Sequence, residues 1–311
     1  MRAVGVTEFG GPEALHVVDV EPEPLGPGQV RLRVEAAAVN PTDTHARSGA
    51  YADRDPVKTP PWVPGMDLAG VVTEVGEGVD HLAVGDAAMG IVVPFGPHGA
   101  YREDKVLPAN SVVRAPRGVD AVAASTLPMN GLTARLALDL MALAPGQVLA
   151  VTGAAGAFGG YVVQLAEADG LTVVADASQA DEQLVRELGA DVVVRRGDDV
   201  AERIREHFPE GVDGLADGSV QDAQVLPAVK DGGAVATVRG YRGNGQRGLR
   251  FFPTLVRRVA EDRAALDRLR QQAEDGVLTL RVARTLPMEE AAEAHRQLER
   301  GGVRGRIVLT F

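Results

Sequence analysis

The sequence predicts an α/β protein in which a β-rich region precedes a doubly wound parallel sheet. Over roughly the first 115 residues, short apolar runs are separated by Gly and Pro, which is typical of β strands and turns. From about residue 121 onward, strand-like and helix-like segments alternate, as they do in right-handed βαβ units with helices on both faces of a parallel sheet. A length of 311 residues is sufficient for two domains of ordinary size.

The strands of the first region are expected from their apolar content and from the turns that bound them. The turn at 24–28 contains Pro and Gly and the turn at 75–79 contains Gly, residues that fix or permit the backbone angles that turns need. The expected strands are 17–20, 30–39, 68–75, 85–93, 100–106 and 112–113.

The second region is expected to fold into a parallel sheet with its crossover helices. The predicted strands are 148–152, 172–175, 191–194, 212–216 and 234–238, and the predicted helices are 157–168, 181–188, 200–207 and 220–229. Beyond it we expect a helix at 256–274, a strand at 277–285, a helix at 288–299 and a strand at 306–311.

The composition favours a small-molecule ligand. The net charge of -11 disfavours a nucleic-acid partner, since such binding depends on neutralising phosphates. No apolar run approaches the roughly 20 residues that a membrane-spanning helix needs. Residues 1–6 read as a strand without the features of a signal peptide, so a cytoplasmic location is expected.

The absence of cysteine limits the chemistry of the chain. It excludes disulfides, thiolate nucleophiles and every zinc site that uses cysteine ligands. Lysine occurs only at positions 58, 105 and 230, so the recognition of a phosphate is expected to fall mainly to arginine.

A glycine-rich turn follows the predicted strand 148–152 and leads into an apolar helix. Its glycines suit a tight turn, close backbone approach to a pyrophosphate and close contact between helix and strand. The N–H groups and the dipole of the helix start then favour phosphate binding. This context favours dinucleotide binding over a purely structural turn. The residues assigned to it are Ala155, Gly156, Ala157, Phe158 and Gly159.

The segment 151–159 looks like the Ala-Ala-Gly turn of the zeta-crystallin-like quinone oxidoreductases, a family of the medium-chain dehydrogenase/reductase superfamily. Other segments that follow the family's order are 10–15, 37–43, 64–70, 84–86, 127–128, 131–134, 187–191 and 305–309. The resemblance implies a Rossmann-like dinucleotide-binding domain and a β-rich, GroES-like catalytic domain. It places the catalytic domain at 1–118 and 256–311 and the Rossmann-like domain at 119–255.

The chain departs from the zinc-dependent members of the superfamily that it resembles. Asn40 stands where they have a cysteine, and Met66 and Asp67 stand where they have a His-Glu pair. We therefore expect no metal. Without a Lewis acid, the reaction that remains easy is hydride addition to an electrophilic acceptor, a quinone or an enone.

The resemblance also assigns the acceptor side of the active site. Asn40 and Tyr51 would line it, with Asp43 as a supporting group, although Asn40 and Pro41 also suit a strand-ending turn. His45 stands where relatives often have Tyr, but a lone His is more often an ordinary polar residue. Asn130 would lie near the nicotinamide, with a helix N-cap as the alternative.

The choice between NADPH and NADH depends on the ends of the second and third Rossmann strands. Asp176 lies close to the place of the carboxylate that binds a ribose hydroxyl and repels a 2'-phosphate, but one residue early. Ser178 is a possible phosphate donor, and Arg195 and Arg196 can grip a phosphate. We expect NADPH, with Arg239 as a further residue of the cofactor site.

The expected activity is an NADPH-dependent, zinc-independent reduction of a quinone or an α,β-unsaturated carbonyl. A free-standing enoyl reductase of a biosynthetic pathway is the close alternative, because patterning does not define the acceptor pocket. The third hypothesis is a non-catalytic NADP-binding protein with a structural or regulatory role. A homodimer through the cofactor domain is expected, with the edge strand after Gly240 as the seam.

Overall fold

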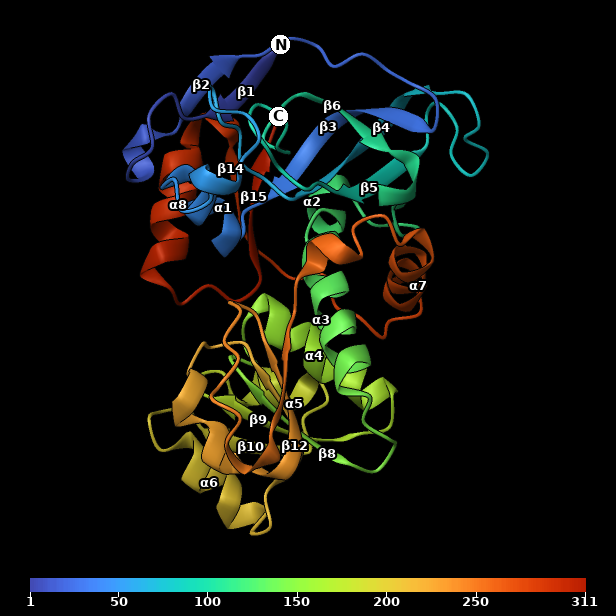
Figure 1. Ribbon diagram of the computed structural model, residues 1–311. Helices are drawn as coiled ribbons and strands as arrows, with labels where there is room; N and C mark the ends of the chain where they lie inside the picture. Colours follow the sequence, from blue (N-terminus) through green and yellow to red (C-terminus); the bar gives the residue numbers. More distant parts are fainter. The chain divides into compact units, whose positions relative to one another are not determined.

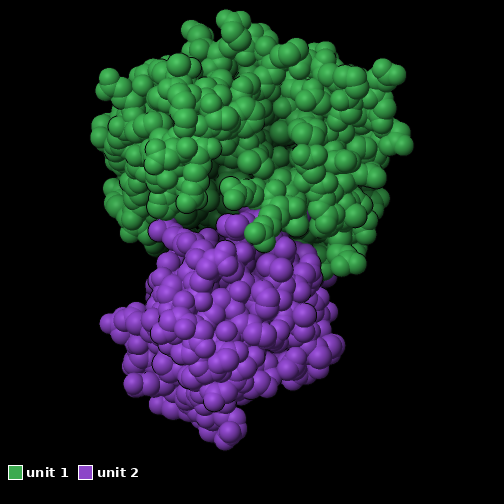
Figure 2. Space-filling model, in the orientation of Figure 1, with its two compact units in different colours: residues 1–129, 257–275, 280–311 green, residues 130–256, 276–279 purple.

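The computed structural model describes all residues from 1 to 311, and the chain forms two compact units (Figure 1). The first unit comprises residues 1–129, 257–275 and 280–311, and the second comprises residues 130–256 and 276–279 (Figure 2). The chain therefore leaves the first unit, forms the second, and returns. No helix combines the length and the apolar character that crossing a membrane requires.

The first unit is built on a seven-stranded sheet. The strands follow the order β14-β15-β3-β4-β5-β7, with β6 paired to β3, and β1 and β2 form a separate antiparallel pair. Their bounds are β1 Arg2–Gly5, β2 His16–Asp19, β3 Gln29–Ala38, β4 Asp67–Val75, β5 Ala87–Ile91, β6 Asp104–Pro108, β7 Val112–Arg114, β14 Val282–Pro287 and β15 Arg306–Thr310.

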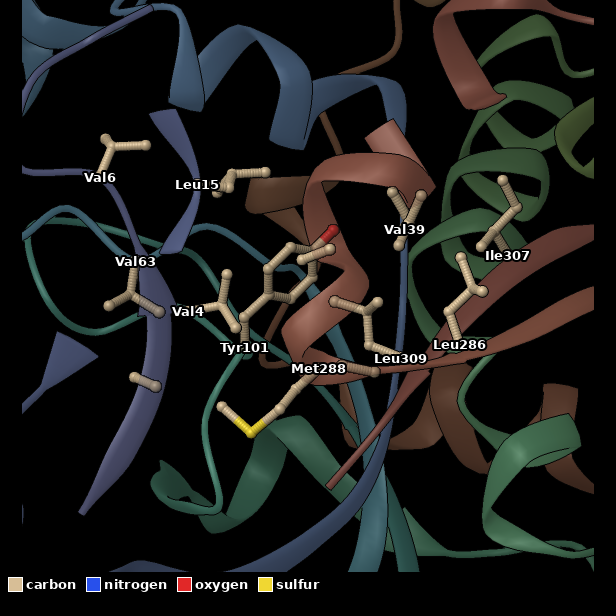
Figure 3. Packing of buried hydrophobic residues seen from close by; sticks show 14 of the residues in the cluster. Val4, Val6, Leu15, Val39, Val63, Tyr101, Leu286, Met288, Ile307 and Leu309 are labelled. Atoms are coloured by element: carbon tan, nitrogen blue, oxygen red, sulfur yellow. The ribbon is translucent and has the colours of Figure 1, made fainter. Parts of the chain in front are cut away.

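One core of the first unit joins segments from both ends of the chain. Tyr101 lies at its centre, among valines of the N-terminal part of the chain and Leu286, Ile307 and Leu309 of the C-terminal strands (Figure 3). The C-terminal segment is thus an integral part of this unit. The helices of the unit are α1 Pro41–Arg47, α2 Ala121–Ala124, α7 Arg263–Glu274 and α8 Ala291–Arg300.

The second unit is a six-stranded sheet in which every neighbouring pair is parallel. Its order is β10-β9-β8-β11-β12-β13, so the chain reverses direction across the sheet between β8 and β11. Ligands bind at such a switch point, outside the carboxyl ends of the strands. The strands are β8 Val148–Thr152, β9 Thr172–Ala177, β10 Val192–Arg195, β11 Val212–Asp217, β12 Val229–Thr237 and β13 Arg250–Pro253.

Helices cover this parallel sheet as the alternating pattern predicts. The helix α4 (Ala157–Ala168) packs on β8 and β9, α5 (Glu182–Glu187) on β9 and β10, and α6 (Val200–His207) on β10. The α/β fold class with a doubly wound sheet is confirmed. The pattern did not predict α1, which lies in the region expected to form strands, or α3 (Pro128–Met141), which lies between that region and the first predicted strand of the parallel sheet.

The helix expected at 220–229 is wrong. Only two short 3-10 turns form there, Asp222–Gln224 and Leu226–Ala228. Pro227 lacks the N–H that a helix interior needs, and Val220 and Asp222 have positive φ angles of 58° and 51°, outside the helical region.

The helix expected at 256–274 is also shorter than predicted. A 3-10 turn, Val256–Arg258, comes first, and α7 starts only at Arg263, capped by Asp262, which accepts from the Ala265 N–H. The remaining 3-10 turns are Pro12–Ala14, Ala52–Arg54, Ala109–Ser111, Gln246–Gly248 and Met288–Glu290.

Candidate active site

The glycine turn lies between the end of β8 at Thr152 and the start of α4 at Ala157, with Gly156 as the N-cap. Gly153 has a φ of +67°, a conformation that favours glycine. A helix leaves its first N–H groups without intrahelical partners, and its dipole makes this end attractive to anions. The predicted strand, turn and helix are therefore present in the order that phosphate binding needs.

Two of the glycines are also required by close backbone approach. A Cβ atom at Gly159 would lie 2.3 Å from the Gly153 carbonyl oxygen, and one at Gly153 would lie 3.0 Å from the backbone of Gly218. Side chains at these positions would push α4 away from the turn, or the turn away from the segment after β11. The turn at 153–159 is therefore lined by backbone at these glycines. This leaves room for a ligand to approach the main chain.

Asp176, at the end of β9, is buried beneath this turn. Its Oδ1 accepts a hydrogen bond from the Ala154 N–H at 3.2 Å. Burial raises the pKa of this carboxyl group, although hydrogen bonds from the Ala154 and Gly153 amides and the charge of Arg196 oppose the rise. The carboxylate thus anchors the turn.

Ser178 and Asp181 form a local pair after β9. The Ser178 hydroxyl donates to Asp181 Oδ2 at 2.5 Å, and Asp181 is buried at the start of α5. Ser178, which the sequence suggested as a hydrogen-bond donor to a phosphate, therefore donates its hydroxyl hydrogen to a carboxylate instead.

Arg195 and Arg196 lie where the third strand of the unit ends. Arg195 pairs with Ala177 of β9, and the Arg196 N–H donates to the Ala177 carbonyl at 2.8 Å. Both side chains are exposed, and the guanidinium of Arg203 binds the Arg195 carbonyl at 2.6 Å. Two exposed guanidinium groups thus stand beside the carboxyl end of β9.

The assignment of Asn130 and Arg239 to the cofactor site had less support from the surrounding sequence than the assignment of the glycine turn. Asn130 is buried within the first turn of α3, two residues after its first residue, so it is not the N-cap of that helix. Arg239 is exposed, just after β12, and its charge opposes the rise that burial and Asp217 cause in the pKa of Asp222.

The sequence reasoning missed the segment 217–222 at the carboxyl end of β11. Asp217 is buried and accepts hydrogen bonds from the Thr152 hydroxyl at 2.7 Å and from the Asp222 N–H at 2.8 Å. Ser219 Oγ and Gln221 Oε1 are buried atoms without a hydrogen-bond partner. An Asp-Gly-Ser sequence directly after a strand of the switch point was the available signal.

In the first unit, Asn40 and Asp43 meet at the start of α1. Asp43 Oδ2 accepts from the Asn40 backbone N–H at 2.8 Å, which caps the helix. The side-chain amide of Asn40 donates to Asp67 Oδ2 at 2.7 Å and to the Ala38 carbonyl at 3.3 Å. Asn40 is fully buried, so both of its amide hydrogens serve the protein itself.

A second hydrogen-bonded chain leads from Asp43 into the core. The Tyr101 hydroxyl donates to Asp43 Oδ2 at 2.9 Å and lies 3.2 Å from His295 Nε2 (Figure 3 shows Tyr101). Arg47 lies 3.5 Å from His295 Nδ1. Burial, aided by Arg47, lowers the pKa of His295 to about 3, so the ring is neutral at pH 7.

Burial raises the pKa of the carboxyl groups of Asp43 and Asp67, which both bond to Asn40. It raises the pKa of Asp43 to about 7 and that of Asp67 to about 6. Asp43 Oδ1 is buried and has no hydrogen-bond partner. Protonation of these groups therefore occurs in the physiological range.

Tyr51 is much more exposed to solvent than Asn40 and Asp43. Its side chain is 40% exposed, before the turn Ala52–Arg54, and its ring lies 6.0 Å from that of His45. The structure thus brings Asn40 and Asp43 together and leaves Tyr51 in contact with solvent.

Met66 and Asp67, which the resemblance aligns with the His-Glu pair of zinc-dependent members, have other partners here. The Thr42 hydroxyl donates to Met66 Sδ at 3.3 Å, and Asp67 is occupied by Asn40 and by the Met129 N–H. No group of three or more His, Cys, Asp or Glu side chains is arranged to hold a metal ion.

Comparison with known proteins identifies both parts of the chain. Residues 26–117 match the alcohol dehydrogenase GroES-like domain, and residues 188–309 match the zinc-binding dehydrogenase family. The chain is 32% identical over 333 residues to the 2-haloacrylate reductase of a Burkholderia species, covering 99% of this chain and 98% of the relative.

Solved structures agree with this result. The quinone oxidoreductase of Coxiella burnetii has a TM-score of 0.88 at 28% identity, covering 100% of this chain and 99% of the other. A mycobacterial protein complexed with NADPH has a TM-score of 0.87 at 28% identity, with full coverage of both chains.

Proposed function

Because the chain belongs to the medium-chain dehydrogenase/reductase superfamily, we propose that it transfers hydride from NADPH to a quinone or an α,β-unsaturated carbonyl compound. It is a nicotinamide-dependent oxidoreductase. The observation that carries the proposal is the glycine turn between β8 and α4, anchored by Asp176 at the switch point of a parallel sheet.

The residues of the second unit fit a dinucleotide. The close approaches at Gly153 and Gly159 leave a cradle of bare backbone, and the start of α4 offers N–H groups to a pyrophosphate. Ser219, whose backbone N–H donates to the Thr152 hydroxyl oxygen at 3.3 Å, and Gln221 each have a buried side-chain oxygen without a partner, suited to ribose or amide groups. The dinucleotide, when bound, supplies the hydride.

The preference for NADPH rests on charge at the ends of β9 and β10. The Asp176 carboxylate accepts a hydrogen bond from the Ala154 N–H. This bond partly offsets the repulsion between the carboxylate and a phosphate. Arg195 and Arg196 are exposed and offer charge-assisted hydrogen bonds, each contributing about 1.5–3 kcal/mol. The paired Ser178 and Asp181 make no such contribution.

On the acceptor side, we assign different tasks to Asn40 and Tyr51. Asn40 positions the start of α1, because its amide hydrogens go to Asp67 and Ala38. Tyr51 is 40% exposed, and we assign to its hydroxyl the donation of a hydrogen bond to the oxygen that gains charge as hydride arrives. Asp43 supports Asn40 through the helix cap.

A quinone or an enone suits this chemistry because its own carbonyl group makes the reacting carbon electrophilic. The donor set beside Asn40, with Met66 and no cysteine in the chain, does not suit a catalytic zinc ion. We therefore propose that no metal takes part.

We also propose a homodimer through the second unit. The strand β13 is an edge of the six-stranded sheet and leaves backbone groups available for a second copy. Sedimentation at micromolar concentration tests this, and a monomer would contradict it.

The activity is tested by offering a panel of quinones and enones with NADPH and, separately, with NADH. We expect NADPH oxidation with at least one acceptor, and much less with NADH. Tight NADPH binding without turnover of any acceptor would instead indicate a non-catalytic NADP-binding protein.

A further inference from the structure

The first unit contains a cavity of about 400 Å³ that includes none of Asn40, Asp43 or Tyr51 in its lining. Small-molecule sites have volumes of about 300–1,000 Å³ and are lined mainly by apolar side chains with a few polar groups. The walls here fit that description, since they include Ile91, Val93, Phe95, Leu107 and Ala260. Its size and lining make it a candidate ligand site.

The edge of this cavity exposes large apolar side chains. Val93 and Phe95 follow β5 and are each 43% exposed, although both are of a size and type that folding normally buries. Covering them with an apolar ligand removes that surface from water, which is favourable in proportion to the area.

The polar groups of the cavity centre on Glu23 and Lys105. The Lys105 ammonium donates to Glu23 Oε1 at 2.7 Å and to Oε2 at 2.9 Å. Glu23 also accepts from Arg102 at 3.0 Å, from the Val106 N–H at 3.0 Å and from His98 at 2.5 Å. The carboxylate is therefore fully used by its neighbours.

Lys105 retains one donor beyond this cluster. An ammonium group has three hydrogens, and Glu23 takes two of them. The third has no acceptor in the protein, while Lys105 is only 5% exposed and lines the cavity. A buried donor without a partner carries a desolvation cost that an added acceptor relieves.

We propose that this cavity binds a small apolar molecule carrying a carbonyl oxygen, which accepts the third hydrogen of Lys105. A neutral carbonyl fits better than a carboxylate, because a carboxylate would lose its hydration in this largely apolar cavity and would lie beside the Glu23 carboxylate. The site does not depend on hydride transfer, so it is independent of the reaction proposed above.

The chemical preference is tested by equilibrium binding of benzophenone and of diphenylmethane, which has the same two rings and no carbonyl. We expect the wild-type protein to bind benzophenone about tenfold more tightly, because of the bond to a charged donor. In Lys105→Met this preference disappears, and the ratio stays informative even if the variant binds both compounds less well. Equal affinities in the wild type, or no binding of benzophenone, would overturn the proposal.

The location is tested by irradiating bound benzophenone and mapping the labelled peptide. We expect labelling within residues 91–95, its loss in Val93→Asp, and wild-type labelling in the control Val84→Asp, which alters a valine that is 67% exposed outside the cavity. NADPH oxidation stays unchanged in both variants. Labelling elsewhere, or unchanged labelling in Val93→Asp, would refute the assignment.

Discussion

Asp176 Oδ1 accepts a hydrogen bond from the Ala154 N–H at 3.2 Å, which ties the end of β9 to the glycine turn that follows β8. The bond joins two neighbouring strands at the place where a dinucleotide pyrophosphate is expected. The carboxylate is buried, so it acts on the shape of the turn rather than on solvent-exposed groups.

Removing this anchor is expected to weaken both cofactors alike. In Asp176→Ala the Ala154 N–H loses its acceptor, a loss that costs about 1–3 kcal/mol for a buried group. We expect the dissociation constants of NADPH and NADH to rise by similar factors, measured by fluorescence titration. Asp176→Asn keeps an acceptor and serves as the control. A selective loss of NADH binding would instead make Asp176 a ribose ligand.

The arginines after β10 are expected to select the phosphate. Arg196→Ala should weaken NADPH binding by roughly 10- to 100-fold and change NADH binding little, because only NADPH carries the 2'-phosphate. Arg186→Ala, on the exposed face of α5, is the matched control. Equal or tighter binding of NADH by the wild-type protein would contradict the preference.

The buried carboxyl groups beside Asn40 make stability depend on pH. An unfolded Asp titrates near 3.8, whereas burial raises the pKa of Asp43 to about 7 in the folded state. The folded protein therefore binds more protons than the unfolded chain between these values, and the free energy of unfolding falls as pH rises from about 4 to 7.

Asp43→Asn should flatten this fall by an amount on the order of 2–4 kcal/mol, measured by urea unfolding at each pH. Asp67→Asn should act in a narrower window, because its pKa is raised only to about 6. The exposed Asp53→Asn is a control expected to leave the profile unchanged. A profile of Asp43→Asn that parallels the wild type would show that this group stays ionised.

The Tyr51 hydroxyl is expected to assist the acceptor. Tyr51→Phe should lower kcat/KM by roughly 10- to 100-fold, less than the 100- to 1,000-fold typical of a well-organised oxyanion site, because a quinone needs less stabilisation. The NADPH dissociation constant should stay nearly constant. Tyr241→Phe removes a hydroxyl in the second unit and should leave kcat/KM intact. Full turnover in Tyr51→Phe would remove Tyr51 from the site.

The purified protein is expected to carry no stoichiometric zinc. The chain has no cysteine, and the family resemblance aligns Met66 with a histidine ligand of the zinc-dependent members. Elemental analysis measures this directly, and chelators should leave activity unchanged. One zinc ion bound per chain would contradict the prediction.

Sequence reasoning was most successful where structure depends on neighbours along the chain. The strand Val148–Thr152 and the helix Ala157–Ala168 are present as predicted, because apolar periodicity and glycine preferences act over a few residues. It failed at 220–229, where apolar spacing suggested a helix but Pro227 and the hydrogen bonds of Asp217 favour tight turns.

By itself, the sequence determined the fold class, the glycine turn and the family, because these depend on local patterns and on motifs in a fixed order. The tertiary structure alone decided which groups each polar side chain meets. Asn40 reaches Asp67, 27 residues away, and Asp176 reaches Ala154, 22 residues away. Such pairings depend on strand register and on burial, which no short stretch of sequence specifies.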